Sequence, residues 1–396
     1  MKAFNLLATA SLVGLLVTGC GGNQAAPAST NAAQTQPAST EQVKPEEKKE
    51  LTPAEYTQAA KDLIAELEKG KAGGKVDWDK AQKIYGDNLK ALVQSRDEEN
   101  SDQTNDHLET AMNAGKDGSL SALTVAELHE KLLYKVFFQS MRHDFKEAND
   151  KFKDKDKATA EITEAKGFYD GLMKDMVGKR DTKYGTQLVS TIDAGFGEMD
   201  SALEKGDNLA FNLGKQVVDK TIMKAFYLAS GAEKGYGYKL EGLVKEGSKD
   251  DLKAEQAEGW AFFQSLKGYL SENDKADVDY INQQFDLSND VKNIKGDLIN
   301  KAYVRAFANT AKGEYKETFE NWGKDKAAIT AMEGALFIDV VKNDLPKALG
   351  SEAKAKALID NAQKLINEVK AGNKDGATAV FKLVEADLDK LTKYGK

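Results

Sequence analysis

The scarcity of proline is the feature that most restricts the fold of this chain. Its five prolines stand at positions 27, 37, 45, 53 and 346, so residues 54–345 contain none. Proline in a helix interior costs about 3 kcal/mol, because it lacks an N–H donor and its ring clashes with the preceding turn. Hydrophobic residues make up 41% of the chain, which is enough to build a core. We therefore predict an all-α fold.

One helical pattern recurs three times and consists of a cation, a second cation four residues later and a Phe two residues after that. In a helix the two cations share one face, and the Phe lies about 200° from the second cation, on the opposite face. The pattern predicts an amphipathic helix with a solvated basic rim and a buried Phe. Its members are Lys131, Lys135 and Phe137, then Lys220, Lys224 and Phe226, then Lys301, Arg305 and Phe307.

A second recurring stretch follows Ala and centres on Gly167, Gly259 and Gly334, with Lys83 in the corresponding slot of the first copy. These positions are spaced by 84, 92 and 75 residues, and the first cations of the Lys/Lys/Phe pattern by 89 and 81. Similar steps in two markers predict about four tandem, divergent helical-hairpin units of about 85 residues, forming an elongated array or linked helical bundles. Lys382 stands in a fourth copy without the second cation or the Phe, as expected of a capping unit.

Several local features support this organisation. Thr52, Pro53 and Glu55 predict a helix start, and Gly70 a stop after about Lys69. The recurring glycines are expected at close helix contacts, with a flexible hinge as the alternative. The aromatic residues near them are expected in the core, and these are Tyr85, Phe168, Tyr169, Trp260, Phe262, Phe263 and Phe337.

The N-terminus resembles that of bacterial lipoproteins. A cation at Lys2 precedes an apolar run of roughly 14 residues, which is too short for a membrane span and typical of a signal peptide. The run ends in Leu-Val-Thr-Gly-Cys, similar to a lipobox, with Cys20 as the only cysteine. The resemblance covers residues 1–20 and implies export, cleavage before Cys20 and lipid attachment to its thiol.

The predicted division of the chain follows from these features. It comprises a signal peptide (1–19), a lipidated Cys with a disordered tether (20–50), a first helix plus unit 1 (51–150), unit 2 (151–248), unit 3 (249–323) and a capping unit 4 (324–396).

The net charge and the missing motifs argue against several classes of function. A net charge of −8 with both signs mixed argues against nucleic-acid binding. Nucleotide-binding glycine motifs and the Gly-x-Ser-x-Gly motif of hydrolases are missing from the sequence. We expect no enzymatic activity and no cofactor.

The candidate binding residues are the repeated cations Lys131, Lys135, Lys220, Lys224, Lys301 and Arg305. One interpretation is a solvated face that pairs with nearby acids, for example Lys135 or Lys224 with Asp97 or Asp181. The other is a groove that holds an anionic cell-envelope polymer.

The histidines His107, His129 and His143 all lie in the first unit. His129, Met141 and His143 are the candidate metal or haem ligands, although His129 and His143 would be about 21 Å apart on one helix.

The sequence thus favours a non-catalytic binding or scaffolding lipoprotein outside the cytoplasm, anchored to the cell membrane through Cys20, with an envelope polymer or an envelope protein as partner. The alternative is a metal- or haem-handling accessory lipoprotein.

Overall fold

The computed structural model describes residues 51–248 and 251–396. Regular secondary structure in these two ranges is entirely helical, which confirms the all-α prediction. Within them, no helix has both the length and the apolar composition required to cross a membrane. The signal peptide, Cys20 and the tether predicted for 1–50 lie outside the described residues.

The first helix, α1 (Pro53–Glu68), begins as the sequence predicts. The Thr52 hydroxyl accepts a hydrogen bond from the Glu55 backbone N–H, and the Glu55 carboxylate accepts one from the Thr52 N–H at 2.7 Å. Two donors of the first turn are thereby satisfied. The 3₁₀ turn η1 (Lys69–Ala72) follows, and Gly73 then takes the left-handed conformation with φ 72°.

Four groups of helices follow, called segments 1 to 4. Segment 1 comprises α2 (Trp78–Ile84), η2 (Tyr85–Leu89), α3 (Lys90–Asn100), α4 (Thr104–Lys116) and α5 (Ala122–Asp150). Segment 2 comprises α6 (Lys155–Phe168), η3 (Tyr169–Met173), α7 (Lys174–Tyr184), α8 (Leu188–Lys205) and α9 (Asn208–Ser230). After α10 (Tyr236–Glu246), segment 3 comprises α11 (Leu252–Ser271), α12 (Lys275–Phe285), η4 (Val291–Asn293) and α13 (Gly296–Glu320). Segment 4 comprises α14 (Asp325–Val340), η5 (Lys342–Asp344), α15 (Leu345–Leu349), α16 (Glu352–Lys370) and α17 (Lys374–Leu391).

The segments are richer than the predicted helical hairpins. A further helix stands between the two predicted ones, namely α4, α8, α12 or α16. In α8, Leu188, Ile192, Phe196, Met199 and Leu203 are buried at steps of three or four residues. This helical period makes α8 a core helix, where the hairpin prediction allowed only smaller pieces.

Segments 1 and 2 share two details at a spacing of 84 residues. The π-helical turns η2 and η3 begin at Tyr85 and Tyr169. The carboxylates of Asp97 and Asp181 accept backbone N–H groups at the start of α4 and α8. α8 is five residues longer than α4, which accounts for the 89-residue step between Lys131 and Lys220.

Consecutive segments meet through the predicted phenylalanines. The ring centroid of Phe137 lies 5.1 Å from that of Phe168, and Phe226 lies 6.2 Å from Phe262. The Phe307 centroid is 6.1 Å from that of Phe337. All three repeated Phe side chains are fully buried, as predicted. The predicted core aromatics, from Tyr85 to Phe337, are buried as well.

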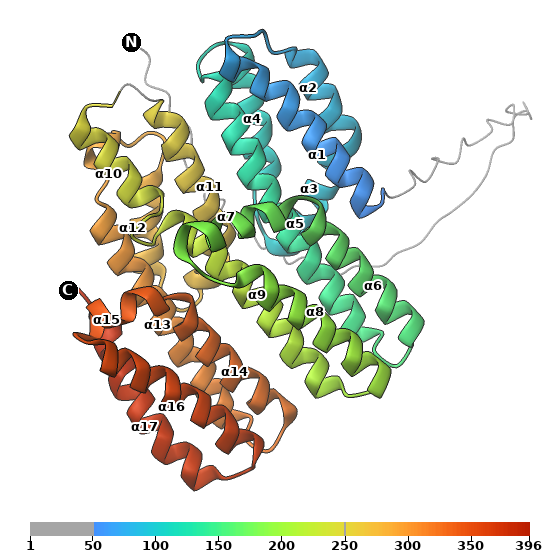
Figure 1. Ribbon diagram of the computed structural model, residues 1–396. Helices are drawn as coiled ribbons and strands as arrows, with labels where there is room; N and C mark the ends of the chain where they lie inside the picture. The colour runs from blue at the N-terminus through green and yellow to red at the C-terminus, as the bar shows by residue number, and fades with distance from the viewer. Residues whose placement is uncertain (1–50, 249–250) are drawn as a thin grey trace, which may run out of the picture. The chain divides into compact units, whose positions relative to one another are not determined.

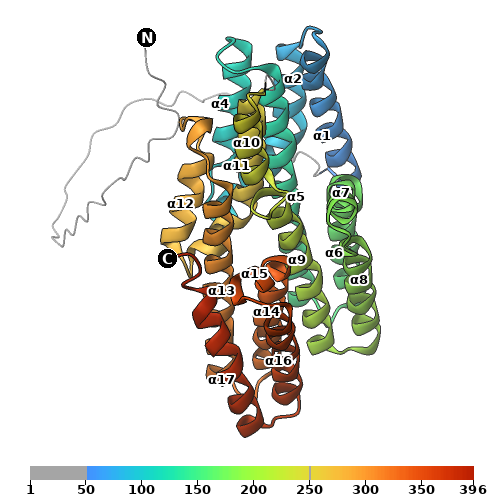
Figure 2. The same cartoon turned by 60° about the vertical axis from the view of Figure 1, so that its left-hand side comes forward.

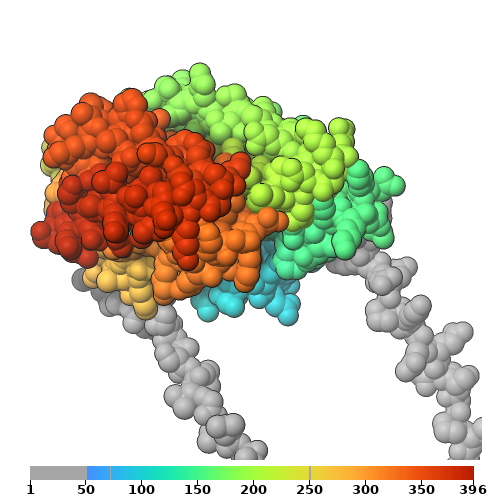
Figure 3. Space-filling view, turned by 90° about the horizontal axis from the view of Figure 1, so that it is seen from below, coloured from blue at the N-terminus to red at the C-terminus, as the bar shows by residue number. Residues whose placement is uncertain are grey.

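Alternate segments are also in contact. The long helix α5 of segment 1 packs against α11 of segment 3, and α9 of segment 2 packs against α14 of segment 4. Figures 1 and 2 show the second of these pairs with α9 beside α14. In the space-filling view, orange and red residues of segment 4 adjoin the yellow-green residues of segment 2 (Figure 3). Each long helix is therefore covered from two directions.

The recurring glycines lie at close contacts. A Cβ on Gly259 would lie 2.5 Å from the Phe285 ring, and one on Gly334 would lie 2.7 Å from the Tyr315 ring. Both distances are too short for a side chain, so glycine lets the helices approach. This supports the packing interpretation over the hinge.

We expect Phe226→Ala to destabilise the protein by about 3–5 kcal/mol, the usual cost of emptying a buried Phe site. Phe226 is fully buried and its ring faces those of Phe138 and Phe262. Urea unfolding followed by circular dichroism measures the effect. Leu383→Ala is the control, because Leu383 is 56% exposed. Equal effects for the two variants would contradict the importance of this contact.

Candidate anion-binding cavity

The predicted solvated rim is wrong. Five of the six repeated cations are buried, with exposed fractions of 8% for Lys131, 4% for Lys135, 3% for Lys220, 6% for Lys224 and 8% for Arg305. Lys301 is half-buried. The physical reason is that neighbouring helices cover the basic face as well as the Phe face. These cations do not line a solvent-exposed groove for a polymer.

The second cation of each pattern is neutralised by a carboxylate, but by other acids than predicted. Lys135 pairs with Asp102, Lys224 with Asp339 at 2.7 Å, and Arg305 with Asp277. Asp97 and Asp181 form no such pair because their carboxylates cap α4 and α8. An acid at a helix N-terminus is already satisfied by backbone donors.

The first cation connects alternate segments in two of the three copies, whereas Lys301 pairs with Asp297 within α13. Lys131 on α5 lies 3.3 Å from Glu258 on α11, and Lys220 on α9 lies 3.2 Å from Glu333 on α14. Lys131 also pairs with Glu127 and Glu130. Burial alone would lower the pKa of Lys131, but the three carboxylates outweigh it and raise the pKa above its usual value.

A cavity of about 260 Å³ lies beside the second of these contacts. It is bounded by helices α5, α9, α11 and α14. Its lining residues are Arg142, Phe145, Lys215, Gln216, Asp219, Lys220, Tyr269 and Glu333. Of the sequence-predicted binding residues, this cavity contains Lys220.

The charged groups of the cavity form a chain. Arg142 donates from Nε and Nη2 to the two carboxylate oxygens of Asp219, at 2.5 and 2.9 Å. Lys220 donates to Asp219 at 2.8 Å and pairs with Glu333. Burial would raise the pKa of Asp219, but the two cations hold it below its usual value. Both carboxylates are therefore already paired with cations of the lining.

Lys215 differs from the other charged residues of the cavity lining. It forms no ion pair with any residue in the described ranges, and burial lowers the pKa of its ammonium group. The lining holds three cations against two carboxylates, which leaves one positive charge. The Arg142 side chain keeps 29% of its surface exposed, so the charged wall is open to solvent.

Aromatic rings form the rest of the wall. The Lys220 ammonium lies 4.6 Å from the centroid of the Tyr269 ring, and the Arg142 guanidinium 5.5 Å from it. The Tyr269 hydroxyl donates to Glu314 on α13 at 2.9 Å. Burial and the nearby Glu333 raise the pKa of Glu314 to about 7. A carboxyl group that titrates near neutrality thus stands behind the cavity wall.

The candidate metal or haem ligands are distributed along α5. His129 and Met141 are fully buried, and the His129 Nδ1–H donates to the Val125 carbonyl at 2.8 Å. Burial lowers the pKa of His129 to about 4. His143 is half-exposed, with Nδ1 3.1 Å from a Glu99 carboxylate oxygen. The continuous helix places His129 and His143 about 21 Å apart, too far for one ion.

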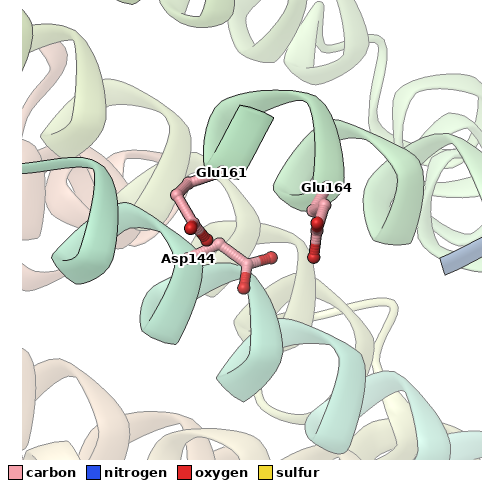
Figure 4. A group of neighbouring side chains, drawn as sticks. All are labelled: Asp144, Glu161 and Glu164. Atoms are coloured by element: carbon pink, nitrogen blue, oxygen red, sulfur yellow. The ribbon is translucent and has the colours of Figure 1, made fainter. Parts of the chain in front are cut away.

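Three acids near the end of α5 come closer together. Ligand atoms of Asp144, Glu161 and Glu164 lie within 4.8 Å of one another, with Asp144 on α5 and the two glutamates on α6 (Figure 4). Glu161 also accepts a hydrogen bond from Lys151 at 2.7 Å. The cluster therefore takes part in an ion pair between the two helices.

The sequence analysis missed seven of the eight lining residues, and of the two missed cations, Lys215 and Arg142, one had a signal. Five residues before the first cation of the pattern stand Ala126, Lys215 and Gly296 in the three copies. A lysine in a slot filled elsewhere by small residues marks Lys215 as a departure from the repeat. Arg142 had no comparable signal, because its position follows the pattern and carries no recurring residue type.

Comparisons of the chain with protein-family models, with curated proteins and with solved structures found no match.

We expect Lys220→Met to destabilise the protein by about 3–5 kcal/mol, because Glu333 loses its buried partner. Lys356→Met is the matched control, since Lys356 is 75% exposed and pairs with Asp360 on the surface. It should change the free energy of unfolding by less than about 1 kcal/mol. Urea unfolding of both variants measures the change. If Lys220→Met lowers the free energy of unfolding no more than the control does, this pair is not a structural link.

Proposed function

We propose that the protein is a lipid-anchored, extracytoplasmic binding module whose helical body takes up a small anionic ligand in the cavity at Lys215 and Lys220. The observation that carries the proposal is the unpaired Lys215 in a solvent-open cavity whose lining has one excess positive charge. Lys215 is half-buried, so its ammonium group is partly desolvated and would gain a partner when an anion enters the cavity.

The location of the body is a proposal from the sequence. The apolar run that ends at Cys20 supports export and lipid attachment, and two or three acyl chains on one Cys give stable anchoring. The stretch at 21–50 is rich in Ala, Gln, Thr, Pro and charged residues and would serve as a tether. The body would then meet its ligand outside the cytoplasm.

The non-catalytic character rests on the way the charges are used. Most of the buried cations have carboxylate partners that fix helices to one another. Such pairs position the segments and leave the cavity as the place where a charge is free to act. Recognition of an anion, followed by its release, is the simplest role that these groups support.

We expect Cys20→Ser to release the protein from membranes when it is expressed in a bacterial host with a lipoprotein pathway. The only thiol would be lost, and with it the point of acylation. Phase partitioning in a mild detergent measures the change, with Ser29→Ala as a control substitution outside the lipobox. Membrane association of both variants would sink the anchor proposal.

We expect the purified body to bind at least one of acetate, benzoate and inorganic phosphate, and Lys215→Gln to weaken that binding by roughly tenfold or more, the value of a charge-assisted hydrogen bond. Isothermal titration calorimetry measures the affinity. Lys205→Gln is the control, because Lys205 is exposed at the end of α8. The proposed function fails if none of the three anions binds, or if Lys215→Gln binds as tightly as the control.

A further inference from the structure

Resting on the proposed function, we infer that the cavity at Lys215 binds a small monocarboxylate together with one proton, which is held by the Glu314–Glu333 pair behind the cavity wall. The residues that line the cavity indicate the class of ligand, and the acidic groups next to the lining indicate where the proton is held.

The charge of the lining selects a monoanion. Arg142, Lys215 and Lys220 face Asp219 and Glu333, so one negative charge completes the balance. A doubly charged phosphate monoester would leave an excess negative charge among half-buried groups. The donors that remain are the Lys215 ammonium and the exposed part of the Arg142 guanidinium, two groups for the two oxygens of a carboxylate.

The size and the walls favour a short organic acid. A cavity of about 260 Å³ holds the volume of roughly nine waters. The rings of Phe145 and Tyr269 line the same space. They offer apolar surface to the organic part of the ligand, whereas an inorganic oxyanion has nothing to place there.

The proton site lies next to the Tyr269 side of the cavity and is formed by residues of three helices. Glu314 on α13 accepts from Tyr269 on α11 at 2.9 Å and faces Glu333 on α14. Lys220 on α9 pairs with Glu333 at 3.2 Å, favours the ionised form of Glu314 through its charge, and is shared with Asp219. Lys326 on α14 is engaged by Glu317, one turn along α13. Both lysines that act on the two acids are thus also engaged by another carboxylate, and the repulsion between Glu314 and Glu333 falls when one of them is protonated.

An anion in the cavity strengthens this preference. The anion would interact with Lys220, a cation that acts on both acids, and would add a second negative charge near them. The pKa of Glu314, already about 7 because of burial and Glu333, therefore rises further in the complex. A group whose pKa rises on binding takes up a proton, so the affinity is highest below about pH 7 and falls as the pH increases.

The test is calorimetric titration of the purified full-length protein with benzoate, which is ionised throughout the range from about pH 5.5 to about pH 8.5. We expect roughly tenfold weaker binding at the upper end of this range, the size of a Coulomb coupling across a helix contact. Titrations near pH 7 in buffers of different ionisation enthalpy should show net proton uptake.

Two variants on α13 separate the proton site from other groups. Glu314→Gln should bind benzoate with little pH dependence and without proton uptake, because glutamine is neutral like the protonated acid. Glu320→Gln should behave as the wild type, since Glu320 is exposed, pairs with Lys316 and lies outside the cavity lining. A slope that persists in Glu314→Gln would assign the proton to Lys215, whose pKa is lowered by burial, and would overturn the inference.

The outcomes distinguish the inference from the function on which it rests. Binding of benzoate without proton uptake would overturn the proton site and leave the anion cavity standing. Preferential binding of inorganic phosphate over benzoate and acetate would overturn the monocarboxylate assignment. Failure of all three anions to bind would remove the proposed function itself.

Discussion

Two buried lysine–glutamate pairs hold alternate segments of this helical body in register. Lys131 with Glu258 ties segment 1 to segment 3, and Lys220 with Glu333 ties segment 2 to segment 4. An ammonium group this deep is tolerated only next to a carboxylate, since an isolated buried charge costs several kcal/mol. A shift of one helix along its neighbour would separate both pairs. The phenylalanine contacts between consecutive segments tolerate small displacements. The lysine–glutamate pairs tolerate less, so they determine the positions of the helices more closely than the ring contacts do.

The two pairs sit in equivalent places but in opposite electrostatic surroundings. Lys131 is met by Glu127, Glu130 and Glu258, a local excess of acid. Around Lys220 the balance is reversed, because Arg142 and Lys215 join it. One contact is therefore saturated, whereas the other retains a charge that the protein leaves unpaired. This difference between two similarly placed pairs supports our choice of the second contact as the place where the protein binds its ligand.

Sequence reasoning predicted the parts of this fold that depend on local rules. The capping box at Thr52 and Glu55, the burial of Phe137, Phe226 and Phe307, and the close packing at Gly259 and Gly334 each follow from one residue type in one kind of place. Sequence reasoning failed where another helix covers a face that the pattern indicates as exposed. The pattern of Lys131 and Lys135 indicates a solvent face, but α11 and the residues around Asp102 cover that face. Periodicity reports how polar a face is and cannot report that another helix supplies the counter-charges. The cavity has the same origin, since Arg142, Lys215 and Tyr269 meet only through packing between helices.

Arg305 illustrates how the order of synthesis enters the assembly of such a body. Its guanidinium binds Asp277, which precedes it, and also donates to the backbone carbonyl of Tyr394 at 2.7 Å, 89 residues further along the chain. At bacterial or eukaryotic elongation rates this acceptor leaves the ribosome roughly 5–20 s after the arginine. During that interval segment 3 carries a cation whose second acceptor does not yet exist. The charge of Arg305 can be neutralised early by Asp277, but its hydrogen bond to the Tyr394 carbonyl forms only after that residue has been made.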